Sequence, residues 1–244
     1  MVLNPSHCGR ALALFAALTL CGAASVASAK TVDPVVAVLY FDYNGQTKEM
    51  EVLKKGLAQM LISDLQGTDG VKIVERDRLE EILKEIDLGK SKKVDSSTAA
   101  KIGKLLGARY FVWGSYFDLF GTLQIDARVT NVETGVHVGV AKANGKPEDF
   151  MSMKDKLAAD LEVALRTQLP AIVVDETKVK KKKAKRKRRR QPKKMKASLA
   201  LRYAKALDAK DRGDIKAAKT ALKEVCAAAP EFELAAVDLA NLVQ

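Results

Sequence analysis

Few residues of this chain are of the types that enzymes use for nucleophilic, acid–base or metal chemistry. His137 stands between Val136 and Val138, and a histidine there would act as a general base only if a carboxylate oriented its ring. A lone histidine on a strand is more often structural, so an exported enzyme that uses His137 is the weakest of three hypotheses. The charged stretches 75–78 and 126–128 are interpreted as ion pairs at a helix start and across strands.

Two short motifs fail the tests for a nucleotide site or an acyl-enzyme site. Gly89-Lys90-Ser91 would belong to a phosphate-binding loop only if a glycine stood five positions before the Gly-Lys pair, where the chain has Lys84. Thr98-Ala99-Ala100-Lys101 resembles the start of a serine acylase motif, but the companion motifs are missing and helix capping explains it. The sequence therefore predicts no cofactor and no catalytic residue.

The amino terminus has the three parts of a secretory signal. Arg10 supplies positive charge, residues 11–20 form an apolar core, and Ala27-Ser28-Ala29 is a small-x-small cleavage site before Lys30. An apolar stretch of this length is too short for a membrane-spanning helix, which needs ~20 residues. We therefore expect export, cleavage between Ala29 and Lys30, and a soluble mature chain in the periplasm or cell envelope.

Removal of the predicted signal leaves one cysteine and one histidine in the chain. Of the 3 cysteines and 2 histidines, only Cys226 and His137 lie in the predicted mature chain. This inventory excludes an intrachain disulfide and a zinc site of Cys and His ligands, and no metal site is predicted. A lipoprotein, with Cys21 as the lipidated residue, is disfavoured because Leu20 stands where that processing requires a small residue.

Positive charge is concentrated in one segment of the chain. The 42 basic and 30 acidic residues give a net +12, yet residues 178–196 hold 14 of the basic residues and no acid, so the remainder carries −2. Like charges and few apolar residues predict a disordered linker over 175–196. The candidate anion-binding residues within it are Lys180, Lys181, Lys182, Lys183, Lys185, Arg186, Lys187, Arg188, Arg189 and Arg190.

Two interpretations of this basic run stay open. It is either a solvated spacer or a tether to polyanions, because each Lys or Arg near an anionic lipid surface contributes ~1 kcal/mol. In an exported protein the anionic partner would be phospholipid, phosphorylated lipopolysaccharide or an acidic protein. Nucleic acid is disfavoured because the remainder of the chain is mildly acidic and the run has no aromatic residue that stacks on bases.

The elements that would position any site alternate between strand and helix. Residues 35–41 form a continuous apolar run, typical of a strand covered on both faces, and residues 42–45 are expected to be a turn. Strict alternation over 121–131 predicts a strand with one buried face. Further helices are expected over 48–66 and 147–168, in a segment with Leu79, Ile82, Leu83 and Ile86 inward, and from the capping residues Asp95, Ser96 and Ser97 onward. The other expected strands are 71–74, 109–117 and one in which Val136, Val138 and Val140 share one face. The order βαβααβββα predicts an α/β (α+β) fold with a mixed sheet of about five strands.

With these elements placed, residues 36–145 resemble the curli-secretion CsgG family and the related amino-terminal domain of TolB. The matching stretches are VAVLYFDYNG, GLAQMLISDLQ, VKIVERDRLEEIL, AAKIGKLLGARYFVWGSY and LQIDARVTNVETGVHV. The resemblance implies an envelope protein, periplasmic or associated with the outer membrane, that has no catalytic activity. It also implies the second hypothesis, a subunit of an oligomeric secretion or assembly channel. An accessory protein is favoured because the alternating strands are needed for the domain's own sheet.

The carboxyl-terminal region resembles part of a tetratricopeptide repeat. The residues that carry this resemblance are Ala206, Gly213, Ala218, Leu222 and Pro230. About three such repeats are usually needed for an independent solenoid, so this region is expected to be a helical hairpin with an added helix that either docks elsewhere or binds a partner.

These features predict four parts of the chain. They are a signal peptide at 1–29, a CsgG- and TolB-like domain at 30–174, a basic disordered linker at 175–196 and a tetratricopeptide-like region at 197–244. The leading hypothesis is a non-enzymatic accessory or scaffold protein of the periplasm. Its helical tail would bind envelope proteins, and its linker would contact anionic surfaces.

Overall fold

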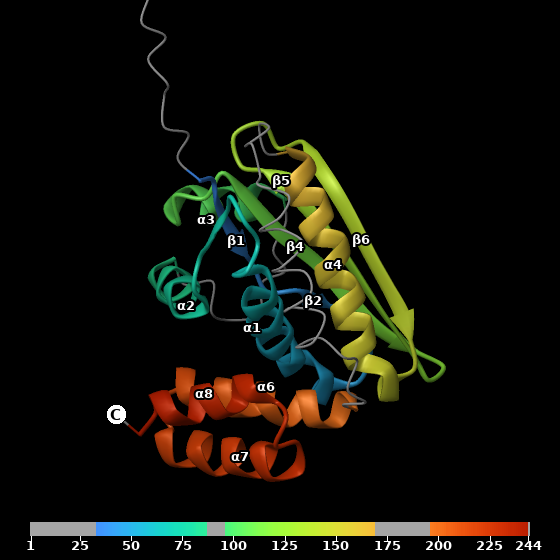
Figure 1. Cartoon of the computed structure of the whole chain (residues 1–244), viewed down its shortest axis with the longest axis vertical. Coiled ribbons are helices and arrows are strands. Elements are labelled where there is room, and N and C mark those ends of the chain that lie inside the picture. The colour runs from blue at the N-terminus through green and yellow to red at the C-terminus, as the bar shows by residue number, and fades with distance from the viewer. Residues whose placement is uncertain (1–32, 87–95, 169–195, 244) are drawn as a thin grey trace, which may run out of the picture. The chain divides into compact units, whose positions relative to one another are not determined.

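A mixed β-sheet with helices on both faces forms the first part of the structure, and three helices form the second (Figure 1). The computed structural model describes residues 33–86, 96–168 and 196–243. Its elements in chain order are β1 (Val35–Val38), β2 (Asp42–Tyr43), the 3-10 helix η1 (Lys48–Val52), α1 (Leu53–Leu65), β3 (Lys72–Ile73), α2 (Arg76–Glu85), α3 (Ser96–Leu105), β4 (Tyr110–Leu119), β5 (Thr122–Asn131), β6 (His137–Gly145), the 3-10 helix η2 (Pro147–Asp149), α4 (Phe150–Gln168), α6 (Ala197–Asp211), α7 (Ile215–Ala228) and α8 (Glu233–Asn241).

The sheet has six strands, and its strand order confirms the predicted mixed architecture. Along the sheet the order is β3-β1-β4-β5-β6; β1 pairs in parallel with β3 and β4, and β4, β5 and β6 form an antiparallel meander. The sixth strand is β2, which pairs in parallel with β4. This strand lies in a segment that is expected from sequence to be a turn, because two residues are too few for strand periodicity to be visible.

The apolar run at the start of the domain is buried on both faces, as predicted. Val36 and Val38 of β1 belong to a core cluster that also contains residues of α1 and α4. Ala37 and Leu39 belong to a second cluster with α2 and α3. Successive side chains of a strand point to opposite faces, so β1 joins the two layers of helices through the sheet.

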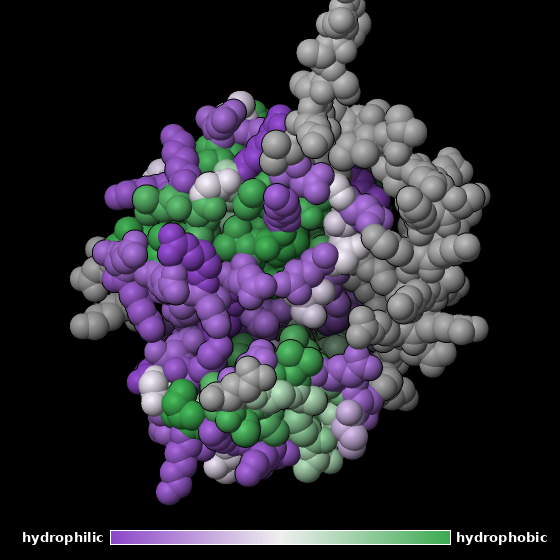
Figure 2. All heavy atoms as spheres, turned by 60° about the vertical axis from the view of Figure 1, so that its left-hand side comes forward, coloured by the Kyte–Doolittle hydropathy of each residue, from purple (hydrophilic) through white to green (hydrophobic). Residues whose placement is uncertain are grey.

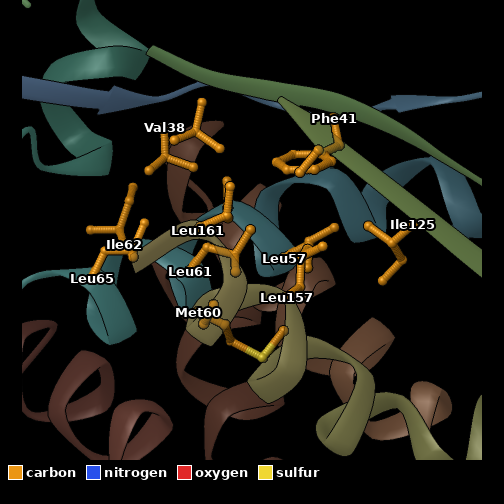
Figure 3. Close-up of a cluster of buried hydrophobic side chains, with 14 of the residues drawn as sticks. Val38, Phe41, Leu57, Met60, Leu61, Ile62, Leu65, Ile125, Leu157 and Leu161 are labelled. Carbon is orange, nitrogen blue, oxygen red and sulfur yellow. The ribbon is translucent and has the colours of Figure 1, made fainter. Parts of the chain in front are cut away.

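Helices α1 and α4 bury their apolar stripes together against the sheet. Figure 3 shows Leu57 and Leu61 of α1 beside Leu157 and Leu161 of α4. All four side chains have 0% exposure. An ion pair also joins the two helices, because Nζ of the buried Lys154 of α4 lies 2.7 Å from Asp64 Oδ2 of α1.

The meander confirms one prediction and corrects another. On β5 the alternating residues Leu123, Ile125, Ala127 and Val129 are all fully buried, as expected. The three valines near β6 do not share one face. Val129 of β5 pairs with Gly139 of β6, but the next residue, Thr130, pairs with His137, so a β-bulge leaves Val138 without a partner in the ladder. Val138 packs on the core, whereas Val136 and Val140 are 58% and 56% exposed. A bulge inserts one residue into a strand and shifts the alternation, which a regular period of two does not foresee.

The helical tail packs on the α/β part of the structure. Helix α6 contacts α1, η1 and η2, and its residues Ala200, Tyr203 and Leu207 belong to the same core cluster as α1 and α4. Helices α7 and α8 follow α6 as the predicted hairpin with an added helix (Figure 1). Of the two alternatives left open for the tail, the structure supports docking on another part of the chain.

Candidate functional site

Most of the candidate site residues predicted from sequence cannot be placed. The ten basic residues of the linker and the expected cleavage point between Ala29 and Lys30 lie outside the described residues. The Gly89-Lys90-Ser91 motif does so as well. The anionic-surface interpretation of the linker and the signal peptide therefore remain predictions.

His137 lies at the start of β6 and is oriented by a hydroxyl group. The Trp113 Nε1–H donates to Thr130 Oγ1 at 3.0 Å, and Thr130 Oγ1 lies 2.8 Å from His137 Nδ1. Because the Thr130 hydroxyl has one proton and a second lone pair, it can hydrogen bond to either neutral tautomer of His137. Within the three described ranges, no carboxylate hydrogen bonds to His137, so the orienting acid that catalysis by His137 requires is missing there.

Of the two charged residues for which a cross-strand ion pair was predicted, Asp126 forms one and Arg128 does not. Lys142 Nζ of β6 lies 3.3 Å from Asp126 Oδ1 of β5. Arg128 stacks on an aromatic ring instead of pairing with Asp126, since its guanidinium carbon lies 5.7 Å from the centroid of the Trp113 ring. In the described ranges no group of three or more His, Cys, Asp or Glu could hold a metal ion.

The strongest polar site in the structure is a buried ion cluster between α2 and α6. Arg76, the first residue of α2, is 3% exposed. Its Nη1 and Nη2 donate to Asp211 Oδ2 and Oδ1 at 2.8 and 2.9 Å, which is the bidentate geometry that a guanidinium makes with a carboxylate. Asp211 is the last residue of α6, so this pair joins the α/β part to the tail.

Lysine and glutamate side chains extend the cluster to a third helix. Lys55 Nζ of α1 lies 2.8 Å from Asp211 Oδ2, 3.0 Å from Asp208 Oδ1 and 3.1 Å from Glu80 Oε1. The Tyr40 hydroxyl donates to Glu80 Oε1 at 2.9 Å. The cluster therefore ties α1, α2 and α6 together at one place, and we name these residues, Tyr40, Lys55, Arg76, Glu80, Asp208 and Asp211, the tail clamp.

The electrostatics of the tail clamp favour the charged form of Asp211. Burial would raise the pKa of Asp211, but hydrogen bonds from Arg76 and the charge of Arg76 outweigh burial and lower that pKa from 3.8 to about 2. For Glu80 the balance is reversed: burial, followed by its contact with Asp211, raises the pKa of its carboxyl. Three carboxylates share two cations in the tail clamp, so one carboxylate is the least well compensated, and that residue is Glu80.

Small residues allow α6 to approach α1 closely. A Cβ atom on Gly56 of α1 would lie 2.9 Å from Ala204 Cβ and 3.3 Å from the Ala200 carbonyl oxygen of α6. On α6 itself, Tyr203 is fully buried and its hydroxyl donates to Asp238 Oδ2 of α8 at 2.5 Å. The tyrosine ring meets Phe232 edge to face, with 5.1 Å between centroids. The same helix thus holds α1 on one side and α8 on another.

Beside the tail clamp, a cavity of about 250 Å³ opens between α1, α2, α6 and α8. Polar side chains dominate its lining, among them Gln59, Asp77, Lys210, Asp238 and Asn241. Lys210 and Asp77 pair across it at 2.8 Å. Figure 2, in which the tail lies below, shows a hydrophilic band between the two parts of the molecule and hydrophobic side chains exposed on the tail. On α8 and just beyond it, Val237 and Val243 are 54% and 68% exposed.

The sequence carried one signal for the tail clamp that was not used. Arg76, Leu79 and Leu83 recur at three- and four-residue steps, so the arginine continues the apolar stripe of α2. A charged residue in a buried stripe requires a partner of opposite charge. Its partner Asp211 lies 135 positions away, and no local pattern indicates such a pairing.

Several solved structures match part of this chain at low sequence identity. The LpoB carboxyl-terminal domain from Salmonella enterica is 17% identical, with a TM-score of 0.38, and the match covers 49% of this chain and 87% of that domain. Lipoprotein GNA1162 from Neisseria meningitidis is 14% identical, with a TM-score of 0.39, over 46% of this chain and 80% of that chain. TolB from Acinetobacter baumannii is 11% identical, with a TM-score of 0.35, over 55% of this chain and 28% of that chain.

One curated protein also matches part of the chain. It is a putative adenylate cyclase 3 from Rhizobium meliloti (strain 1021), 25% identical over 138 residues. The match covers 57% of this chain and 22% of that protein, so this chain spans about a fifth of the cyclase's length. In the described part of the chain, no helix is long and apolar enough to cross a membrane.

The family comparison covers the α/β part of the structure up to the start of α4. The model of the curli production assembly/transport component CsgG matches residues 22–149, which is more than half of the 244 residues. Its range includes every strand of the sheet, from β1 to β6. The chain therefore belongs to the CsgG family.

Proposed function

We propose that this chain is an exported, non-enzymatic scaffold of the periplasm in which the CsgG-like domain and the helical tail act as one platform. The observation that carries the proposal is the tail clamp, with the bidentate pair of Arg76 and Asp211 at its centre. A buried ion cluster of this kind fixes one arrangement of the elements that contribute to it, because any other arrangement leaves a buried charge without a partner. The tail is then held in a defined position, as a scaffold requires.

The partner-binding surface of this platform would lie on α7 and α8. Helix α6 is committed to α1 and to the core, since Ala200, Tyr203 and Ala204 are fully buried. Helix α8 packs on the hairpin through Ala235, yet leaves Val237 54% exposed. The tetratricopeptide-like interpretation fits this arrangement: Ala218 and Leu222 are buried between the helices, and Gly213 takes a φ of 82° in the turn. In such repeats each helix pair offers its outer face to a neighbour, and here that neighbour would be an envelope protein.

The basic run would hold the platform near an anionic surface. The run has 14 Lys and Arg between residues 178 and 196, and it directly precedes α6. Its partner would be phospholipid or lipopolysaccharide, and each basic residue near such a surface contributes ~1 kcal/mol that salt weakens. Binding to anionic vesicles should therefore fall steeply from low to high salt. A protein without residues 178–196 that still binds equally well would exclude this role.

The partner-binding surface can be tested with two valines of similar exposure. Val237→Asp places a charge on α8, and Val163→Asp places the same charge on α4, where Val163 is 62% exposed. We expect Val237→Asp to abolish the recovery of a cross-linked envelope partner and Val163→Asp to leave it unchanged. Equal recovery with both variants, at unchanged circular dichroism, would show that α8 is not the binding surface.

A channel subunit is the second candidate function, and the family description favours it because it names an assembly/transport component. The two candidates differ in oligomeric state. Rings in detergent extracts of the envelope would support the channel, and a monomer in the periplasmic fraction would support the accessory role. An enzyme that depends on His137 is the third candidate. Activity screening of wild type against His137→Ala tests it, and we expect no difference in activity between the two.

A further inference from the structure

The turn between β4 and β5 presents two apolar side chains to solvent. Phe120 is 97% exposed and Leu119 is 55% exposed. The ladder between the strands continues to the pair Leu119 and Thr122, so that Phe120 and Gly121 alone form the turn. Their φ values of 48° and 73° are both positive, as in a type I′ turn.

Phenylalanine is an unfavourable residue at this position for two independent reasons. In the described ranges, Phe120 is the only residue other than glycine with a positive φ, a conformation that asparagine or glycine adopts far more readily. Its ring also remains almost wholly in water. Asparagine would remove both disadvantages, so neither the turn nor the core of the domain explains an aromatic residue here. A strained and exposed apolar residue points to a contact outside the fold.

Side chains at the base of the turn contact β2 and the loop that follows it. Asp118 accepts hydrogen bonds from the Tyr43 hydroxyl and from Thr47 Oγ1, the second at 3.1 Å. The Tyr43 ring packs on Tyr116 with 5.1 Å between centroids. These contacts join β2 and the loop after it to the end of β4. The end of β4 is therefore joined to β2, and the Phe120 ring extends into solvent instead of packing on the sheet.

The position of the turn indicates what it contacts. Leu123 beside the turn pairs with Gly145 at the end of β6, and η2 follows directly. Helix α6 contacts η2, and Figure 1 shows the start of α6 at the same end of the sheet as the turn between β4 and β5. The basic run ends at Lys196, the N-cap residue of α6. Close to the turn in sequence and pairing, Lys146 is offset by Glu148 and Asp149, so the proposed anionic contact depends on the basic run.

We propose that Leu119 and Phe120 insert into the interfacial region of a lipid bilayer with anionic headgroups. This inference rests on the proposed function in taking the surface near the basic run to be anionic lipid. One apolar group or one basic patch gives marginal membrane binding, whereas the combination of the two gives stable attachment. The turn would supply the apolar contact, and it would also set which end of the domain faces the membrane.

The test measures binding of the full chain, and of its variants, to phosphatidylglycerol and phosphatidylcholine vesicles by cosedimentation. Phe120→Asn suits the turn, so it should fold at least as stably as wild type while its affinity for phosphatidylglycerol vesicles falls ~10-fold, as expected from the loss of one buried aromatic side chain. Val163→Asn, at an exposed valine on α4, is the matched control and should bind as wild type does. Phe120→Trp should keep the affinity and show a blue-shifted emission when vesicles are added.

The two sources of attachment give different results. If Phe120→Asn binds as tightly as wild type, while removal of residues 178–196 abolishes binding, the membrane contact of the turn is excluded and the tether stands. If neither change affects binding, or if wild type binds neither vesicle, both the tether and the inserted turn are excluded. If Phe120→Asn weakens binding equally at low and high salt, while removal of the basic run weakens it mainly at low salt, both are supported.

Discussion

An arginine that is 3% exposed must find its counter-charge inside the protein, and Arg76 finds it on the tail. Both charges, on Arg76 of α2 and on Asp211 of α6, are removed from water where the two helices meet, and this desolvation costs free energy. Once both are buried, the loss of either leaves the other uncompensated. Substitution of a single charged residue of the tail clamp is therefore expected to destabilise the protein strongly.

Arg76→Ala should lower the free energy of unfolding by ~3–5 kcal/mol, because it leaves Asp211 buried without its bidentate partner. Arg78→Ala is the matched control on the same helix: Arg78 pairs with Glu81 at 2.7 Å, but both side chains are more than half exposed. An exposed pair of this kind contributes ~1 kcal/mol or less. Urea denaturation of the two variants measures the difference, and equal losses would contradict the role assigned to Arg76.

Acid should weaken the tail clamp in a defined range of pH. The pKa of Asp211 is lowered from 3.8 to about 2 in the folded protein, so the stability that this carboxylate provides is complete above the unfolded value and is lost as the pH falls from about 4 to 2. Glu80 acts in the opposite direction, because its raised pKa makes protonation favour the folded state. Thermal midpoints measured against pH should fall more steeply in this range for wild type than for Asp211→Asn. Parallel curves would show that Asp211 gains no stabilisation from Arg76.

At the scale of elements, the sequence predicted most where periodicity was regular. The strand over β5 and the two-sided burial of β1 follow from alternation and from a continuous apolar run, and both are confirmed. The first turns of two predicted helices are 3-10 helices, η1 and η2, which the same apolar stripes do not distinguish. Strand β2 and the bulge at Val138 were missed because each depends on pairing with a neighbouring strand and not on a local pattern.

The contact between α1 and α6 depends on the absence of a side chain. A Cβ on Gly56 would come within 2.9 Å of Ala204 Cβ, so the two helix backbones are closer than most side chains permit. Nothing in the sequence around Gly56 distinguishes this close approach from an ordinary helical glycine, which explains why docking of the tail stayed an open alternative.

Gly56→Leu should separate α6 from α1 and lower the free energy of unfolding by ~1–3 kcal/mol, the usual cost of overpacking. Ala204→Gly should recover part of this loss, because it removes the atom that the new side chain would meet. A double-mutant cycle by chemical denaturation measures the recovery. Strictly additive effects of the two substitutions would mean that the helices do not pack at this point.

At the scale of the whole molecule, the sequence predicted the family and the order of its parts, and the comparisons confirm the family. The boundaries of the signal, domain, linker and tail remain predictions. What the sequence did not indicate is that α6 shares a core with α1 and α4, because residues that meet across more than a hundred positions leave no periodic trace. The proposed scaffold depends on this shared core, since a tail that moved independently would present no fixed surface.

Differential scanning calorimetry of residues 30–244 tests this central claim most directly. If domain and tail share one core, the protein should unfold in a single transition whose calorimetric and van't Hoff enthalpies agree, and Asp211→Asn should shift that whole transition to lower temperature. Two separate transitions, of which Asp211→Asn moves at most one, would contradict the account.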